Sequence, residues 1–334
     1  MKRHCFIIAE AGVNHNGDPY LAERLIDAAA EAGADAVKFQ TFHADQLAAP
    51  NLATTAYQQE NSGKKTQQEM LARLELDEPA HRRLRDHAIR RNIEFLSTPF
   101  DPPSIELLER LDLPRFKVPS GQITDVPYLE RIGRTGKPVI LSTGMATLGE
   151  VEHAIEILTR AGTPRKAITL LHATTAYPTP MDQVNLRAMQ TLGSAFELPY
   201  GYSDHTRGIE VTIAAVALGA CVIEKHVTLD RTLPGPDHAA SLEPPELTAM
   251  ISAIRNVERA LGSALKQPTP VEKTNAPLVR KRIVASTFIR KGESFSEGNL
   301  TTRRAPLGIC ASRWHEVIGL PADREYRPGE GVLP

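Results

Sequence analysis

The chain is built on a repeating pattern, in which a short apolar run and a polar loop are followed by an amphipathic segment. The clearest example is the stretch from Tyr200 to Thr228, where two apolar runs flank a helix-like segment. One apolar helix face, at i, i+4, i+7 and i+8, is formed by Ile209, Ile213, Val216 and Ala217. The pattern predicts a strand, a helix and a second strand buried in a parallel sheet.

The same unit recurs along the first part of the chain. Six earlier apolar runs precede this pair: Cys5–Ala9, Asp35–Gln40, Glu94–Leu96, Arg115–Val118, Pro138–Leu141 and Ala167–His172. Eight strand–helix units in about 260 residues predict an α/β fold, a (β/α)8 TIM barrel. A doubly wound open sheet is the alternative, but no GxGxxG motif follows the first strand.

The hydrophobic pattern also divides the chain into parts. Residues 1–262 hold the repeated units, and residues 263–279 are polar and contain prolines, as is typical of a linker. Residues 280–334 alternate short strands with turns, and such a small domain is expected to lean on another surface. Between Thr41 and Gln68 the chain is polar and weakly periodic, which indicates a lid or a binding loop.

Polar residues gather directly after the predicted strands, at the end where TIM barrels carry their active sites. They are Glu10, Lys38, Gln40, Thr98, Lys117, Ser120, Ser142, Tyr177, Ser203, His205 and His226. A single serine or threonine there is explained as a helix cap. Lys38 and Lys117 are different, because a lysine within an apolar strand is costly to bury without an anionic partner. They indicate a phosphorylated or carboxylated substrate.

His205 and His226 follow two neighbouring strands of one βαβ unit, so both are expected to face one cleft, beside Ser203 and Lys225. Imidazole is a common ligand of transition metals. Each histidine alone is also explained by a hydrogen-bonded place in the core, so the pair leaves both interpretations open. A site with two histidines suits a divalent ion that keeps open coordination positions for Lewis-acid chemistry.

Composition restricts the class of protein. The chain has 334 residues, a formal net charge of −1 and 41% hydrophobic residues, which argues against a general nucleic-acid or membrane-binding surface. The three cysteines, Cys5, Cys221 and Cys310, form no CxxC motif and indicate a reducing compartment without disulfides. Neither a signal-peptide pattern nor a spanning apolar stretch is found, so a cytoplasmic location is expected.

Nine sequence blocks in order resemble the sialic acid synthase family nearly from end to end. They are IIAEAGVNHNGD, AVKFQTF, LSTPFD, FKVPSGQ, ILSTGMATL, YPTP, GYSDHT, EKHVTLD and PGPDHAAS. The resemblance implies a TIM barrel followed by an antifreeze-like (SAF, β-clip) domain that includes GESFSEGNLTTRRAPLG. It also implies condensation of phosphoenolpyruvate with an N-acetylated amino-hexose, with release of phosphate.

Within this family two branches come into question. The blocks GVNHNGD, GYSDHTRGI, HATTAYP and SEGNLTTRR, together with Thr175, resemble the branch that makes N,N'-diacetyllegionaminate from 2,4-diacetamido-2,4,6-trideoxymannose. The alternative is an N-acetylneuraminate synthase that uses N-acetylmannosamine.

The resemblance assigns roles position by position. His205 and His226 would bind a divalent ion, Mn²⁺ first and Mg²⁺ or Co²⁺ otherwise, and Glu10 would be the acid/base and also touch the sugar. Phosphoenolpyruvate would be held by Lys38, Thr98, Lys117, Ser120, Ser142 and Ser203. The amino sugar would be contacted by Gln40, Tyr177, Asp237 and Arg304, with Arg304 supplied by the other subunit of a domain-swapped homodimer.

The chain departs from the family pattern at several of these positions. Gln122 stands where the family usually has glutamate, so it is expected only to orient a water. Ala173 and Ala176 replace the more usual cysteine and glutamate, and the turn after Arg304 differs in sequence.

Two other classes of protein fit the sequence less well. A barrel metallohydrolase usually has a His-x-His motif after the first strand, where this chain has Asn14-His15-Asn16. An ice- or carbohydrate-binding module is suggested only by the C-terminal part, and the two lysines and two histidines argue against it.

Overall fold

The computed structural model describes residues 4–55, 59 and 63–334 of the chain. Residues Met1–Gly262 form one compact unit and Ser263–Pro334 form a second. Within the predicted Thr41–Gln68 loop, residues 56–58 and 60–62 lie outside the described residues. The remainder of that loop contains a short helix, α2 (Ala44–Leu47), and a bridge between Ala53 and Thr66.

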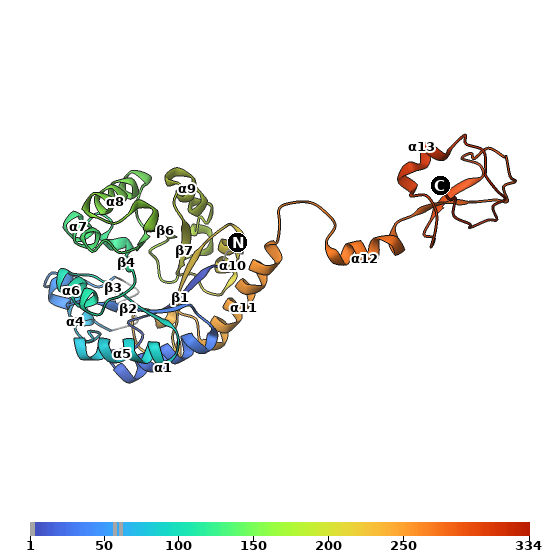
Figure 1. Ribbon diagram of the computed structural model, residues 1–334. Coiled ribbons are helices and arrows are strands. Elements are labelled where there is room, and N and C mark those ends of the chain that lie inside the picture. The colour runs from blue at the N-terminus through green and yellow to red at the C-terminus, as the bar shows by residue number, and fades with distance from the viewer. Residues whose placement is uncertain (1–3, 56–58, 60–62) are drawn as a thin grey trace. The chain divides into compact units, whose positions relative to one another are not determined.

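The first unit is a ring of parallel strands with helices around it (Figure 1). The strands are β1 (Phe6–Gly12), β2 (Ala36–Thr41), β3 (Glu94–Pro99), β4 (Phe116–Val118), β5 (Val139–Ser142), β6 (Ile168–Ala173), β7 (Tyr200–Asp204) and β8 (Val222–His226). Their hydrogen-bonded order is β3-β2-β1-β8-β7-β6-β5-β4, and β3 also packs against β4. The strands thus make a near-closed barrel, and the prediction of a (β/α)8 fold is confirmed.

The helices begin and end on residues that the sequence marks. They are α1 (Pro19–Ala32), α4 (Gln67–Leu71), α5 (Glu78–Arg90), α6 (Pro102–Arg110), α7 (Val126–Arg134), α8 (Leu148–Ala161), α9 (Arg187–Phe196), α10 (Glu210–Ala217) and α11 (Pro244–Leu261). An aspartate caps α1, α5, α6 and α7, each with a proline in its first turn. No helix in the described part of the chain is long and apolar enough to cross a membrane.

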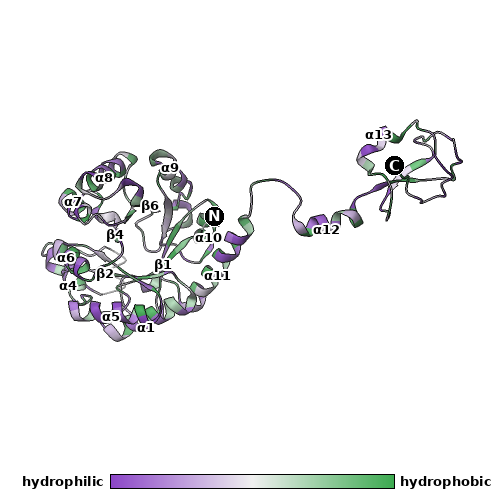
Figure 2. Cartoon of the chain, in the orientation of Figure 1, coloured by the Kyte–Doolittle hydropathy of each residue, from purple (hydrophilic) through white to green (hydrophobic). Residues whose placement is uncertain are grey.

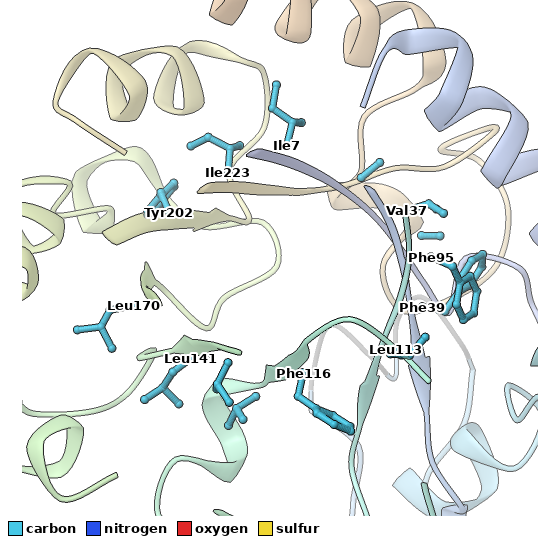
Figure 3. Packing of buried hydrophobic residues seen from close by; sticks show 14 of the residues in the cluster. Ile7, Val37, Phe39, Phe95, Leu113, Phe116, Leu141, Leu170, Tyr202 and Ile223 are labelled. Atoms are coloured by element: carbon cyan, nitrogen blue, oxygen red, sulfur yellow. The ribbon is translucent and has the colours of Figure 1, made fainter. Parts of the chain in front are cut away.

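Two apolar layers hold the barrel together. Side chains such as Ile7, Val37 and Tyr202 point from the strands toward the helices and form the main core (Figure 3). The outer surface of α5 is largely hydrophilic (Figure 2). Inside the ring a second cluster fills the centre of the barrel with Ile8, Ala36, Leu96, Ile140, Leu171 and Val222. The barrel is therefore a packed core rather than a channel.

The predicted inner face of α10 is partly wrong. The helix buries Thr212, Ala215 and Val216, whereas Ala217 is exposed and Ile213 is only partly buried. The segment EVTIAAVA is apolar on nearly every side, so spacing alone could not select the face that packs on the strands.

The second unit has a small core of its own. Its strands β9 (Arg282–Ala285) and β10 (Leu300–Arg303) pair in antiparallel fashion, and a short helix, α13 (Trp314–Val317), follows them. Around them pack Ile283, Ala285, Ile289, Phe295, Leu300, Val317, Ala322, Tyr326 and Val332. The polar segment expected as a linker contains a helix, α12 (Pro270–Val279), started by Thr269 in a capping box with Glu272.

Candidate active site

The candidate site residues lie one inward position beyond the apolar centre of the barrel. Side chains two residues apart on a strand share a face, so five of the six strands that contribute an apolar residue to the centre contribute their next inward residue to a polar layer. Five such steps are Ile8 to Glu10, Ala36 to Lys38, Leu96 to Thr98, Ile140 to Ser142 and Val222 to Glu224. On β6, the step from Leu171 leads to the apolar Ala173.

This polar layer forms the floor of a cavity of about 540 Å³ at the carboxyl ends of the strands. Twelve of the residues singled out from the sequence line it: Glu10, Lys38, Gln40, Thr98, Lys117, Ser120, Ser142, Tyr177, Ser203, His205, His226 and Asp237. Its volume is in the range of sites that bind small molecules. The structure therefore brings together residues that are spread over more than two hundred positions of the chain.

Four buried charges lie side by side on the floor. Lys38 Nζ is 2.6 Å from Glu10 Oε2 and 3.6 Å from Glu224 Oε2, while Lys117 Nζ is 3.4 Å from Glu224 Oε1. Lys38 also donates to Thr98 Oγ1 at 2.8 Å. Glu224 thus bridges the two lysines, and sequence reasoning missed it. The signal was present, since Glu224 lies between Val222 and His226 on the inward face of β8.

The surroundings give the two carboxyl groups, Glu10 and Glu224, very different pKa values. Burial raises the pKa of Glu10 to about 7, because Lys38 offsets only part of the cost of removing its charge from water. Burial also opposes the charge of Glu224, but Lys117 and Lys38 together outweigh it and hold its pKa at about 2. At neutral pH, Glu224 is ionised and Glu10 can both give and accept a proton.

His205 and His226 face the cavity together, with ring centroids 5.4 Å apart. His205 Nδ1 lies 2.7 Å from the carbonyl oxygen of Thr174, which assigns the proton to Nδ1 and leaves Nε2 with its lone pair. The Tyr177 ring packs against the His205 ring, with ring centroids 4.1 Å apart. Burial lowers the pKa of both histidines, that of His226 well below its usual value. Both imidazoles are therefore neutral, the form that binds metals.

These two imidazoles suit a divalent ion. The contact from His205 to a backbone carbonyl is the kind that orients a ligating histidine, and His226 Nδ1 is buried without a hydrogen-bond partner among the described residues. Within residues 4–55, 59 and 63–334, no group of three or more His, Cys, Asp or Glu side chains is arranged to hold an ion. His205 and His226 would therefore be the candidate ligands for such an ion.

Lys225 corrects one expectation, because it does not line the cavity with its neighbours. It is fully buried on the outer face of β8, where its Nζ lies 2.7 Å from Asp204 Oδ2 and donates to the carbonyl oxygen of Thr206. The alternation that turns Glu224 and His226 inward turns Lys225 outward. The ion pair of Lys225 and Asp204 is therefore structural.

We expect Asp204→Ala to lower the free energy of unfolding by about 3–5 kcal/mol, because it leaves the Lys225 charge buried and unpaired. Denaturant unfolding measures the change. The matched control is Glu130→Ala, which removes an exposed helical pair with Arg134 and should cost at most about 0.5 kcal/mol. An Asp204→Ala protein as stable as the control would contradict the structural role.

Besides Lys225, two further residues singled out from the sequence do not line this cavity. The side-chain amide of Gln122 donates to the carbonyl oxygen of Phe100 at 3.0 Å, so it links the loops that follow β4 and β3. Arg304 belongs to the second unit, where it is exposed just after β10.

Comparison with known proteins places the chain in a family. The model of the NeuB family matches residues 25–266. The chain belongs to the NeuB family. This confirms the resemblance to the sialic acid synthases drawn from the sequence blocks.

Three relatives illustrate the similarity. An N,N'-diacetyllegionaminic acid synthase from Campylobacter jejuni is 53% identical over 325 residues, 97% of each chain. One from Legionella pneumophila is 48% identical over 332 residues, covering 98% of this chain and 93% of the relative. The crystal structure of the N-acetylneuraminic acid synthetase from Leptospira borgpetersenii is 37% identical with a TM-score of 0.73, covering 81% of this chain and 90% of that one.

Proposed function

We propose that this enzyme condenses phosphoenolpyruvate with 2,4-diacetamido-2,4,6-trideoxymannose to give N,N'-diacetyllegionaminate and phosphate. The acceptor is supported by the two legionaminic acid synthases to which the chain is similar over nearly its whole length. N-acetylneuraminate synthesis from N-acetylmannosamine is the second candidate, supported by the similarity to the Leptospira synthetase.

The observation that carries the proposal is the pair of buried lysines beside two neutral histidines on one cavity floor. Lys38 and Lys117 are 2% and 4% exposed, so their charges are only weakly screened by water. Their protein partners are Glu224 and Glu10, and with a pKa of about 7 Glu10 is only partly ionised at neutral pH. The floor therefore suits a small ligand with several negative charges, such as phosphoenolpyruvate.

Hydroxyl groups around the lysines complete the proposed site for phosphoenolpyruvate. Ser120 Oγ accepts a hydrogen bond from the backbone amide of Gly144, which leaves its own proton free to be donated. Ser142 Oγ is buried without a hydrogen-bond partner among the described residues. Thr98 Oγ1 accepts from Lys38 Nζ and keeps its own proton, so it and the two serines can donate to phosphate and carboxylate oxygens. The Ser203 hydroxyl instead donates to Glu224 Oε1 at 2.8 Å.

The amino sugar would lie nearer the mouth, against Gln40, Tyr177 and Asp237. Gln40 donates to Glu10 Oε1 at 3.2 Å, so a single contact couples the acceptor site to the acid/base. Burial raises the pKa of Asp237 to about 6. A Glu10 carboxyl that titrates near neutrality can protonate the aldehyde oxygen as it becomes a hydroxyl.

In the proposed reaction, carbon 3 of phosphoenolpyruvate forms a bond with the aldehyde carbon of the open-chain sugar. Water adds to carbon 2, and phosphate leaves by cleavage of the C–O bond. A divalent ion held by His205 and His226 would supply Lewis-acid polarisation of the aldehyde oxygen. Lys38 and Lys117 keep the phosphate and carboxylate charges in place, and such preorganised charges commonly contribute most to catalysis. Gln122 would hold the loop after β4 in position.

Products distinguish the two candidate functions directly. Purified enzyme with Mn²⁺ and phosphoenolpyruvate is given each sugar separately, and the acid formed is identified by mass spectrometry. The expected result is N,N'-diacetyllegionaminate at a kcat/KM well above that for N-acetylmannosamine. A preference for N-acetylmannosamine would transfer the assignment to the second candidate.

We expect Lys38→Met and Lys117→Met to raise the KM for phosphoenolpyruvate much more than the KM for the sugar. Each removes a charge-assisted contact worth about 1.5–3 kcal/mol, which corresponds to roughly ten- to hundredfold. Initial rates measured against each substrate give the two constants. The control is Lys166→Met, an exposed lysine before β6. Unchanged constants for phosphoenolpyruvate in both variants would refute the assignment.

The assembly is also part of the proposal. The second unit, with its motif GESFSEGNLTTRRAPLG, would be an antifreeze-like domain that docks on the barrel of the other subunit of a homodimer. Residues 263–279 would let it cross, and Arg304 would donate to an acetamido oxygen of the sugar. The enzyme would work in the cytoplasm, where phosphoenolpyruvate is available, without a nucleic-acid or membrane partner.

A further inference from the structure

The cavity has a second face that the proposed chemistry does not use. The cavity also has an apolar wall, formed by Val13, Met70, Leu71, Leu74 and Phe100. These side chains come from the loops that follow β1, β2 and β3, whereas His205 directly follows β7 and His226 is the last residue of β8. One cavity therefore joins a charged floor to an apolar wall built from the loops after β1, β2 and β3.

The side chains of the wall are packed in a small core and are not loosely held loop residues. Val13, Met70 and Leu74 are 3%, 4% and 7% exposed and form a small core of their own with Phe42. Phe100 packs on the edge of Phe42, with ring centroids 6.2 Å apart. Short helix α4, capped by Thr66, carries Met70 and Leu71. Because the wall is packed from behind, it presents a fixed apolar surface to a ligand.

We infer that this apolar wall is the specificity subsite for the deoxygenated end of the acceptor, the carbon-6 methyl group, an inference that rests on the proposed function. The aldehyde carbon must lie beside the histidines and Lys38 to react. Carbon 6 is at the far end of the open-chain sugar, so an acceptor extended across the cavity presents that carbon to the wall. A methyl group loses no hydrogen bonds there, whereas a hydroxyl group would have to give up its water.

The size of the effect follows from the chemistry of such pockets. Apolar pockets discriminate between groups differing by a methylene or a hydroxyl by roughly ten- to two-hundredfold. We therefore expect the wild-type enzyme to prefer the 6-deoxy acceptor over its 6-hydroxy analogue within this range of kcat/KM. A polar residue in the wall would accept the hydroxyl and reduce the preference.

The test uses two acceptors that differ only at carbon 6, namely 2,4-diacetamido-2,4,6-trideoxymannose and 2,4-diacetamido-2,4-dideoxymannose. In Met70→Gln and Leu71→Gln, the preference for the 6-deoxy sugar should fall about tenfold, through the KM of the sugar, while the KM for phosphoenolpyruvate stays unchanged. Leu71 is only partly buried, so its variant remains informative if Met70→Gln unfolds. Met145→Gln is the matched control, since Met145 lines the same cavity outside the wall and is exposed. The Met145→Gln variant should prefer the 6-deoxy sugar as strongly as wild type does.

The outcomes separate this inference from the proposed function. If wild type condenses both sugars equally well, or if both wall variants keep the wild-type preference, the subsite is overturned and the function stands. If wild type condenses neither sugar with phosphoenolpyruvate, the proposed function fails and the subsite fails with it.

Discussion

Replacing His205 or His226 by alanine is expected to abolish turnover and metal retention while leaving the barrel folded. Both rings are buried at the ends of neighbouring strands, and the Nδ1 proton of His205 is fixed by the Thr174 carbonyl. Lewis-acid stabilisation is worth several kcal/mol, so the loss should be on the order of a thousandfold or more. Phosphate release measures turnover, and elemental analysis after desalting measures bound metal.

The control for this experiment is His153→Ala, which removes an exposed histidine from α8. It should keep wild-type activity and metal content. Full activity in a metal-stripped wild-type enzyme, or unchanged metal content in both site variants, would show that the two histidines do not form a metal centre.

Mixing a His205→Ala protein with an Arg304→Ala protein is expected to restore activity that neither has alone. In the proposed swapped dimer, the barrel with intact His205 receives Arg304 from the other chain and is complete. Random exchange at equal amounts makes mixed dimers half of the population, each with one whole site, so activity should reach about a quarter of the wild-type value.

The arrangement within one chain predicts the opposite result. If Arg304 served its own barrel, neither site of a mixed dimer would be whole, and the mixture would remain inactive although subunit exchange is demonstrated by labelled chains. The matched control is Arg303→Ala, an equally exposed neighbour on β10, which should be active without any partner protein.

Much of the site could be predicted because parallel strands impose a register on their residues. Lys38 and Lys117 interrupt apolar strands, and His205 and His226 end two strands of one βαβ unit. Each is a polar residue at a position where a buried strand normally has an apolar one, so the sequence alone marks it. The prediction went wrong where the register was not followed through, since Lys225 was placed in the cleft and Glu224 was overlooked. Counting by twos from Val222 corrects both placements.

The apolar wall could not be predicted for a different reason. Met70, Leu71 and Leu74 follow the weakly periodic Thr41–Gln68 segment, and residues outside a regular strand carry no register that says which side of the barrel mouth they face. Their place depends on packing against Val13 and Phe100, from two other loops, and against Phe42 at the start of their own loop. Such contacts between distant segments follow from the tertiary structure alone.

The apolar cluster at the centre of the barrel also determines from which side ligands can enter the cavity. Ile8, Leu96, Ile140 and Leu171 plug the ring directly beneath the charged floor, so the cavity is a blind well with its entrance above. Lys38 and Lys117 lie at the bottom, while Gln40 and Tyr177 are only half-buried nearer the rim. We therefore expect a ligand seated on the lysines to bind before a ligand at the rim. The depth of each binding position in the cavity would thus set the order in which the two substrates bind.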